Sequence, residues 1–400
     1  HSRDWQDVKL TSLIEKAKLI FIQSDISVED AFKTLISHNL TSLPVESFKD
    51  DINCTTFDYT DLNNYLLVVL GKLKFTQSDI DQINLNNKFN SQNHITDFIT
   101  MDIIKQAQRG DQIPIKYVCQ LSPKNPFIKL NEDTQTLSDV VEVLGSGVHR
   151  VAIVNSDPKN PRITGILSQR RLIKYLFDNS KHFPSLETLW SMTLNELNIG
   201  SNFVISIYGD QPLIDALIKM NSDKISSIAV VDRNNNLLGN ISVTDVKHVT
   251  MGSQTRLLYK SCLHFISVIL NSRGLEDGKD SYPVFHVNKS TSFGRTIAKL
   301  VATKAHRLWI VQPKTHSPSF SSSSSVTAQN TIINSSLSSP IPIKPSSASS
   351  KSPTPSPSST PNPGKSGKLI GVVSVTDILG LLARVSSNKF IDPTAARRQR

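Results

Sequence analysis

The chain has 400 residues, room for two or three ordinary domains, and its 38% apolar and 20% charged residues are typical of a globular protein. Its formal net charge is +10, but the segments 313–367 and 384–400 contribute +8, so the remainder is almost neutral and lacks the basic surface of a nucleic-acid-binding protein. No run approaches the roughly 18 consecutive apolar residues of a membrane-spanning helix, so we expect no membrane partner.

One pattern recurs four times along the chain. Blocks of equal length at 18–45, 127–154, 204–231 and 284–311 align without gaps, each with a short apolar run, a polar turn, a helical pattern and a second apolar run. In the third block, Asp210 and Pro212 predict the start of the helix, as a capping residue followed by a proline in the first turn.

Each block continues into a further strand and a second helical pattern, at 57–67, 165–176, 239–250 and 371–382. The third copy of this second helix is expected to run from Val246. One unit therefore reads strand, helix, strand, strand, helix, which predicts an α/β fold. We place the repeats at 12–100, 115–182, 197–252 and 262–386, followed by a basic tail at 387–400.

The fourth repeat is interrupted at 316–367 by a segment rich in serine and proline. This composition buries too little apolar surface to offset chain entropy, so we expect a disordered insert at a strand-to-strand turn. It is either a passive linker or a target of proline-directed phosphorylation. The candidate sites each precede a proline: Ser317, Ser339, Ser352, Thr354, Ser356 and Thr360.

The repeated unit resembles the CBS repeat, a small β-α-β-β-α unit that works in pairs. The resemblance implies two paired, Bateman-type modules, formed by repeats 1 and 2 and by repeats 3 and 4, packed into a disc. The run 168–174, together with His-Arg pairs in the second and fourth repeats, resembles the gamma subunit of AMP-activated protein kinase.

Other stretches are similar to the fungal Sds-type proteins, which are CBS-repeat proteins. The matching segments are 43–46, 53–59, 246–250, 264–275 and 395–400. This resemblance implies a role in cell-cycle progression and cell separation, a location in cytoplasm and nucleus, and restraint of a type 2A Ser/Thr protein phosphatase.

A basic pair precedes the last strand of two blocks, as His149-Arg150 and His306-Arg307. Arginine binds phosphate bidentately and histidine adds a donor, so we predict that both pairs contact an anionic ligand at the mouth of each module's pocket. The corresponding residues of the first and third blocks are Leu40, Thr41, Ile225 and Ser226. Because the kinase gamma subunit has an arginine in its first repeat, we expect only one or two occupied sites here.

Three acids, Asp61, Asp245 and Asp377, each lie where a strand gives way to a helix. An acid there caps free amides and suits the helix dipole. The resemblance implies that in nucleotide-binding CBS proteins the same acid binds the ribose hydroxyls. A capping role and a ligand-binding role therefore both stay open. A serine lies three residues before Asp245, before Asp377 and before the corresponding residue of repeat 2. These serines, Ser242, Ser374 and Ser168, are predicted as helix caps or ligand contacts.

Arg171 occupies the acid's position in repeat 2, next to Arg170. A cation at a helix N-terminus is unfavourable by roughly 0.3–1 kcal/mol, so we predict a phosphate between the helix amides and the guanidinium. The alternative is a salt bridge to a neighbouring carboxylate. We assign both arginines to the same nucleotide pocket as the His-Arg pairs.

No catalytic motif is recognisable: the sequence contains no GxSxG and no HExxH, and 363–366 lacks the upstream glycine of a phosphate loop. Three scattered cysteines, Cys54, Cys119 and Cys262, predict neither disulfides nor a metal site. We therefore predict a non-enzymatic regulatory protein that requires no cofactor and is tuned by AMP, ADP or ATP. Its partner is a Ser/Thr phosphatase or a kinase assembly, and a homodimer stays open. The alternatives are a gamma-like kinase subunit and a nucleotide-independent scaffold.

Overall fold

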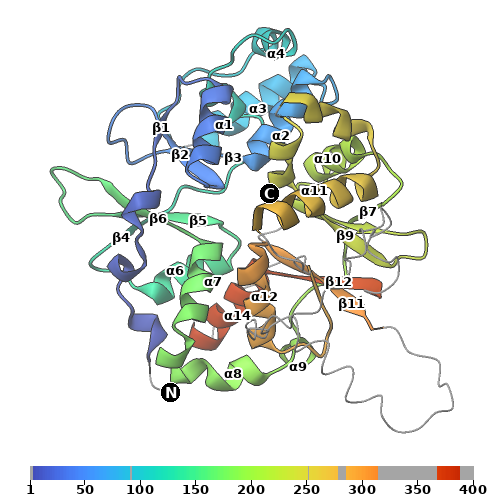
Figure 1. Ribbon diagram of the computed structural model, residues 1–400. Coiled ribbons are helices and arrows are strands. Elements are labelled where there is room, and N and C mark those ends of the chain that lie inside the picture. Colours follow the sequence, from blue (N-terminus) through green and yellow to red (C-terminus); the bar gives the residue numbers. More distant parts are fainter. Residues whose placement is uncertain (1–2, 91, 251, 278–284, 314–366, 388–400) are drawn as a thin grey trace, which may run out of the picture.

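The computed structural model describes residues 3–90, 92–250, 252–277, 285–313 and 367–387 (Figure 1). Within them the chain forms four three-stranded sheets, β1-β2-β3, β4-β5-β6, β7-β8-β9 and β10-β11-β12. In each sheet the first strand is parallel to the second, and the third is antiparallel to the second. This recurring topology confirms an α/β fold built from four copies of one unit.

Repeat 1 follows the expected order of elements. Its elements are β1 (Ile22–Gln23), α1 (Val28–Ser37), β2 (Ser42–Glu46), β3 (Thr55–Asp58) and α2 (Tyr59–Val69). Helix α1 starts where the Ser27 hydroxyl accepts a hydrogen bond from the N–H of Asp30 at 3.1 Å. Val28, Ala31 and Leu35 then recur at helical spacing and are buried, which gives α1 its core-facing side.

Repeat 2 has the same order. Its elements are β4 (Lys129–Asn131), α6 (Leu137–Gly145), β5 (Arg150–Val154), β6 (Ile163–Ser168) and α7 (Gln169–Asp178). Helix α6 opens with a capping box, in which Asp139 accepts a hydrogen bond from the N–H of Thr136 at 2.8 Å.

Repeat 3 departs from the prediction at its second helix. Its elements are β7 (Ser206–Tyr208), α10 (Leu213–Ser222), β8 (Ser227–Val231) and β9 (Leu237–Ser242). The predicted α-helix from Val246 is wrong, because this stretch forms the 3₁₀-helix η6 (Val243–His248). The β-branched side chains of Val243, Thr244 and Val246 lose rotamer freedom in an α-helix, which lowers the helix propensity of this short stretch.

The predicted cap of α10 is also wrong. Pro212 precedes the helix and makes no side-chain capping bond. Asp210 instead forms an ion pair with Arg233, with Oδ1 2.8 Å from Nη2. The exposed arginine lies across the sheet turn and offers the carboxylate a charged, bidentate partner.

Repeat 4 completes the set. Its elements are β10 (His286–Val287), α12 (Phe293–Thr303), β11 (Arg307–Gln312), β12 (Lys368–Ser374) and α14 (Val375–Ser387). Gln312 and Lys368 are register partners in the antiparallel pair β11–β12. The predicted insert 316–367 lies outside the described residues except for Gly367, and the predicted tail 387–400 lies outside them except for Ser387, the last residue of α14.

Further helices precede and connect the repeats. Before repeat 1 lie η1 (Trp5–Asp7), η2 (Leu10–Leu13) and η3 (Lys16–Lys18); between repeats 1 and 2 lie α3 (Gln77–Asn90), α4 (Met101–Gln108) and α5 (Ile115–Val118). Later connections contain η4 (Ser180–His182), η5 (Pro184–Leu186), α8 (Glu187–Ser191), α9 (Leu194–Leu197), η7 (Gly252–Tyr259) and α11 (Cys262–Asp277). Trp5, Leu10 and Leu13 are buried in the core of repeat 2.

The sheets join the repeats into the two predicted pairs. Cys54 of repeat 1 packs with Ala152 and Ile163 of repeat 2. Ala229 of repeat 3 packs with Trp309 of repeat 4, in a second cluster of the same kind. The pairing of repeat 1 with 2 and of repeat 3 with 4 is thus confirmed.

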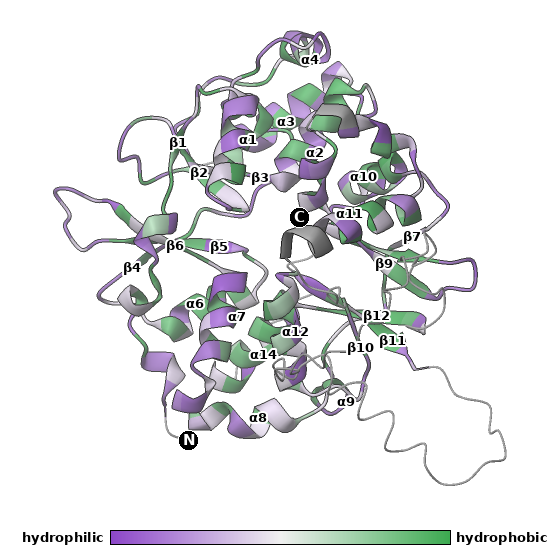
Figure 2. Cartoon of the chain, viewed as in Figure 1, coloured by the Kyte–Doolittle hydropathy of each residue, from purple (hydrophilic) through white to green (hydrophobic). Residues whose placement is uncertain are grey.

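The helices join the two modules. One core contains buried residues of repeats 1 and 3, and the other contains residues of repeats 2 and 4. Figure 1 shows repeats 1 and 3 side by side above repeats 2 and 4, so the four units form a ring. Figure 2 shows hydrophobic and hydrophilic residues on each of α1, α2 and α10, as expected for helices with one buried side. No helix in the described part of the chain combines the length and apolar character needed to cross a bilayer.

Candidate functional site

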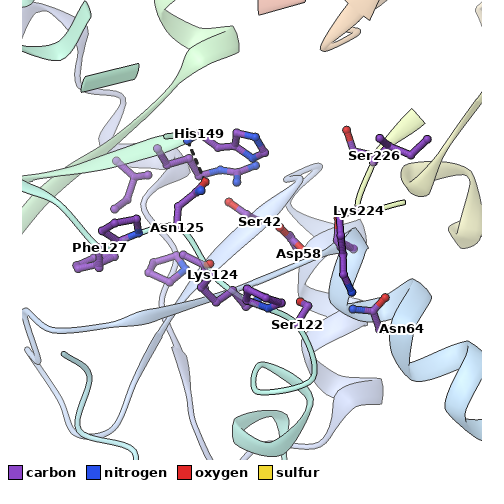
Figure 3. Close-up of a pocket in the computed structure, with 18 of the residues that line it drawn as sticks. Ser42, Asp58, Asn64, Ser122, Lys124, Asn125, Phe127, His149, Lys224 and Ser226 are labelled. Atoms are coloured by element: carbon purple, nitrogen blue, oxygen red, sulfur yellow. Dashed lines mark hydrogen bonds between the residues drawn. The ribbon is translucent and has the colours of Figure 1, made fainter. Parts of the chain in front are cut away.

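A pocket lies where repeats 1, 2 and 3 meet (Figure 3). Residues of repeat 1, the loop 122–127 before β4, the start of β5, and residues between 220 and 226 at the end of α10 line it. Its cavity volume is about 130 Å³. Ordinary small-molecule pockets measure roughly 300–1,000 Å³, so this one accommodates a small anion or one part of a larger ligand without rearrangement.

The two predicted His-Arg pairs come together. His149 and His306 directly precede β5 and β11, and their rings stack with centroids 6.1 Å apart and planes inclined by 19°. Because one ring belongs to each module, the basic ends of both modules face each other. The sequence predicted a separate pocket mouth for each pair, whereas in the structure the histidine of one pair stacks on the histidine of the other.

Each arginine of these pairs reaches the repeat that shares its module. Arg150 donates from Nη2 to Oγ1 of Thr41 at 3.3 Å, and Arg307 donates from Nη1 to the carbonyl oxygen of Ser227 at 3.2 Å. Thr41 and Ser227 lie at or next to the positions that lack arginine in repeats 1 and 3. Each of these arginines, from repeat 2 or repeat 4, therefore also forms a hydrogen bond to the other repeat of its module.

Arg150 and Arg170 lie close enough to affect each other's charge. Burial, and to a lesser extent the neighbouring Arg150, lower the pKa of the Arg170 guanidinium to about 10. Burial also lowers the pKa of Arg150, while Asp58 and Asp61 oppose that shift. Within the described residues, neither arginine forms an ion pair with a carboxylate within 4.0 Å. Two partly buried cations side by side favour a bound anion.

The helix-start acids have the capping role. The carboxylate of Asp61 accepts from the N–H of Asp58 at 3.1 Å, and Asp245 and Asp377 accept from the N–H groups of Ser242 and Ser374 at 2.9 and 2.8 Å. Each pair forms a reciprocal capping box. In repeat 2, the Ser168 hydroxyl accepts from the N–H of Arg171 at 3.1 Å.

Asp61 has a second partner that sequence reasoning missed. The ammonium group of Lys124, in the loop before β4, contacts both of its carboxylate oxygens. The Asp61 side chain is 0% exposed and that of Lys124 is 22% exposed. Burial raises the pKa of Asp61 to about 7, although Lys124 opposes the shift. Burial also disfavours the charged form of Lys124, but Asp61 and Asp58 prevail and raise its pKa.

Arg171 pairs within the protein as well. Its Nε lies 3.0 Å from Oε1 of Glu15, which belongs to the segment before β1. The structure thus shows the alternative, a salt bridge to a neighbouring carboxylate, while the phosphate at Arg171 stays a prediction. Glu15 and Lys124 both come from segments that precede the first strand of a repeat, and each neutralises the helix start of the other repeat.

Of the predicted site residues, His149 and Arg150 line this pocket. His306 adjoins it through the ring stack and Arg170 through Arg150, whereas Asp61, Arg171, Ser242, Asp245, Arg307, Ser374, Asp377 and Ser168 are not lining residues. The remaining polar lining residues were not predicted, among them Ser42, Asp58, Asn64, Lys124, Asn125 and Lys224. Only Asp58, which stands where other repeats have serine, carries a visible sequence signal.

Two other predictions are limited by what the structure covers. All six phosphorylation candidates, Ser317, Ser339, Ser352, Thr354, Ser356 and Thr360, lie outside the described residues. Within the described ranges, no three His, Cys, Asp or Glu side chains are grouped so as to hold a metal ion.

Comparison with known proteins identifies the repeats. The CBS domain model matches residues 118–178 and 198–252. Protein SDS23 of Vanderwaltozyma polyspora is 51% identical over the whole chain, which spans 72% of that protein. Protein SDS24 of Saccharomyces cerevisiae is 49% identical, again over the whole chain and 80% of the relative. Protein SDS23 of Candida albicans is 46% identical over 99% of the chain and 68% of the relative.

A solved structure has the same fold. It is a protein of Methanocaldococcus jannaschii described as a candidate archaeal homologue of g-AMPK. The match covers 94% of this chain and all of that one, with a TM-score of 0.53 and 12% sequence identity. Likeness at this level of identity establishes the four-repeat fold and nothing about ligands.

Proposed function

Since the chain belongs to the fungal family of proteins named SDS23 and SDS24 and is a CBS-repeat regulatory protein, we propose that an adenine nucleotide or related phosphate-bearing ligand sets its regulatory state. The ligand binds where the two modules meet, beside the stacked rings of His149 and His306. The protein acts without catalysis of its own, by changing how it contacts a partner.

The stack of His149 on His306 carries this proposal. It brings the histidine of each His-Arg pair to one place where the two modules meet, and Arg150, next to the first histidine, lines the pocket there. Bidentate guanidinium contacts and imidazole donors suit the oxygens of a phosphate group. An anion placed here is attracted by both modules and favours the arrangement in which they are packed together.

Arg170 strengthens the case for an anion. Burial disfavours the charged form of both Arg170 and Arg150, and Arg150 adds to this effect at Arg170. A phosphate beside them replaces part of the lost hydration with charge-assisted hydrogen bonds. Affinity at this position is therefore expected to rest on the phosphate more than on the base.

The partner we propose is a Ser/Thr protein phosphatase of type 2A, restrained by this protein during cell-cycle progression and cell separation in cytoplasm and nucleus. Support comes from the Sds-type segments of the sequence and from full-length relatives named SDS23 and SDS24. A gamma-like subunit of an AMP-activated-type kinase is the second candidate. The His-Arg pairs of repeats 2 and 4 favour it, whereas Leu40-Thr41 in repeat 1 argues against it.

The test is calorimetric titration of AMP, ADP and ATP into the purified chain and into a variant with His149, Arg150, His306 and Arg307 changed to alanine. We expect micromolar binding that disappears in the variant. The matched control is Arg233→Ala, which removes an exposed cation paired with Asp210 and leaves the pocket intact. Absence of binding at millimolar ligand would refute a nucleotide response and leave a scaffold.

Capture of partners by the purified chain, with and without nucleotide, then separates the two assemblies. Type 2A phosphatase subunits that bind in a nucleotide-dependent way support the first proposal. Stable co-purification of kinase catalytic and scaffold subunits supports the second. A homodimer is recognised in the same preparation by its molar mass in light scattering.

A further inference from the structure

Lys224 lines the pocket from the second module and has an unusual backbone conformation. It follows α10 with a φ of 57°, in the left-handed region that glycine and asparagine usually fill at helix ends. The same position after α1 and α6 is taken by Asn39 and Gly147. A lysine also fills this position after α12, as Lys304, so what distinguishes Lys224 is its place on the pocket wall.

We infer that Lys224 is an anion-binding residue of this pocket, and that a phosphate group held between Lys224 and Arg150 ties the second module to the first. The inference rests on the proposed function, since it names a further contact to the same ligand. It adds a cation from repeat 3, which that function does not require.

The position of Lys224 is fixed by the contact between repeats 1 and 3. Three residues earlier, Asn221 donates from Nδ2 to Oδ1 of Asn64 at 2.6 Å, and both asparagines line the pocket. The N–H of Lys224 donates to the carbonyl oxygen of Asn221 at 3.3 Å. Figure 3 shows the Lys224 side chain beside Asn64, on the side of the pocket opposite Phe127.

The charges around the pocket leave Lys224 available. The ammonium of Lys124, which also lines the pocket, is held by the buried Asp61. Lys224 is exposed, and no hydrogen bond or ion pair joins its ammonium to another described residue. Asp58 supplies a carboxylate to the pocket wall, and its charge interacts favourably with those of Lys124 and Arg150.

Counted together, the charges favour an anion. Asp58 and Asp61 supply at most two negative charges, because burial raises the pKa of Asp61 to about 7, against positive charges on Lys124, Arg150 and Lys224. One positive charge remains before Arg170 and the histidines are considered. The cavity of about 130 Å³ accommodates a phosphate group, so the chemical class of the ligand group is a phosphomonoester or inorganic phosphate.

The test compares Lys224→Asn with Lys304→Asn by calorimetric titration of inorganic phosphate, AMP and adenosine. Asparagine tolerates the left-handed conformation, so the first change removes the amine without adding strain. Lys304 is a matched control because it has a φ of 54° at the end of α12 and does not line the pocket. We expect about tenfold weaker binding of phosphate and AMP in Lys224→Asn, wild-type binding in Lys304→Asn, and rescue in Lys224→Arg.

A second readout addresses the tie between the modules. In the wild-type chain, AMP should slow hydrogen exchange in both α2 and α10, whereas in Lys224→Asn it should slow exchange in α2 alone. Wild-type affinity in Lys224→Asn, together with lost affinity in Arg150→Ala, would overturn this inference and leave the proposed function standing. Absence of phosphate and nucleotide binding in the wild-type chain would overturn both.

Discussion

Replacing Lys124 by methionine tests the ion pair that closes the helix start of repeat 1. Methionine keeps most of the aliphatic stem of the lysine and removes its charge. The carboxylate of Asp61 is then left without a counter-ion at 0% exposure. Removing one partner of a buried ion pair costs about 3–5 kcal/mol, which is a large part of the stability of an ordinary protein.

The size of this loss should depend on pH. Burial already raises the pKa of Asp61 from 3.8 to about 7 in the presence of Lys124, and loss of the ammonium raises it further. An acid whose pKa is higher in the folded than in the unfolded chain takes up a proton on folding, so stability falls as pH rises from about 4 through the folded pKa. We expect the full loss at pH 8 and a smaller one at pH 5.5.

The assay is urea unfolding at both pH values, with Lys174→Met as control. Lys174 forms an exposed pair with Asp178, so its replacement should cost no more than about 0.5 kcal/mol. The double variant Lys124→Met/Asp61→Asn should regain stability at pH 8, because no buried charge remains. A loss in Lys124→Met that equals the control, or that is independent of pH, would contradict this reasoning.

Two further predictions concern the packing of the modules and one partly buried histidine. Gly145→Ala places a Cβ about 2.8 Å from the backbone carbonyl oxygen of Leu379 and should lower the free energy of unfolding in urea by about 1–3 kcal/mol. The control Gly165→Ala meets the movable side chain of Ile14 and should lower it by less. Equal losses in the two variants would argue against a rigid contact between α6 and α14. Burial lowers the pKa of His286 from 6.5 to about 4, so the free energy of unfolding should fall by up to roughly 3 kcal/mol as the pH drops from 6.5 to 4. In thermal unfolding, His286→Gln should remove this dependence of stability on pH. An unchanged dependence in the variant would assign it to other groups.

The repeated unit was predictable because its signals are local. Val28, Ala31 and Leu35 recur at helical spacing, and the strands that follow are short apolar runs. Four aligned copies fixed the order of elements, and the CBS resemblance supplied the pairing. The second helix of repeat 3 failed because weak local propensity, at Val243 and Thr244, allowed a 3₁₀ turn in place of an α-helix.

The candidate site was predictable only in part, because its contacts join residues far apart in sequence. His149 and Arg150 carry a recognisable pattern, and the structure places them in the pocket. The partner of Asp61 is 63 residues further on, in a loop that has no repeat counterpart in the alignment. Lys224 belongs to the third repeat, and nothing in its sequence neighbourhood indicates a left-handed backbone or a pocket lined by the first two repeats.

The register of β11 and β12 has a consequence for how this protein can change over time. Gln312 and Lys368 are held opposite each other by the strand pair, so the two ends of the connection between them are fixed whatever its length. Each doubling of the length of a chain connection adds only ~0.6 kcal/mol of closure entropy. Lineages can therefore lengthen or shorten this stretch at little thermodynamic penalty, and an experimenter can place a fluorescent reporter there without disturbing the four-repeat ring.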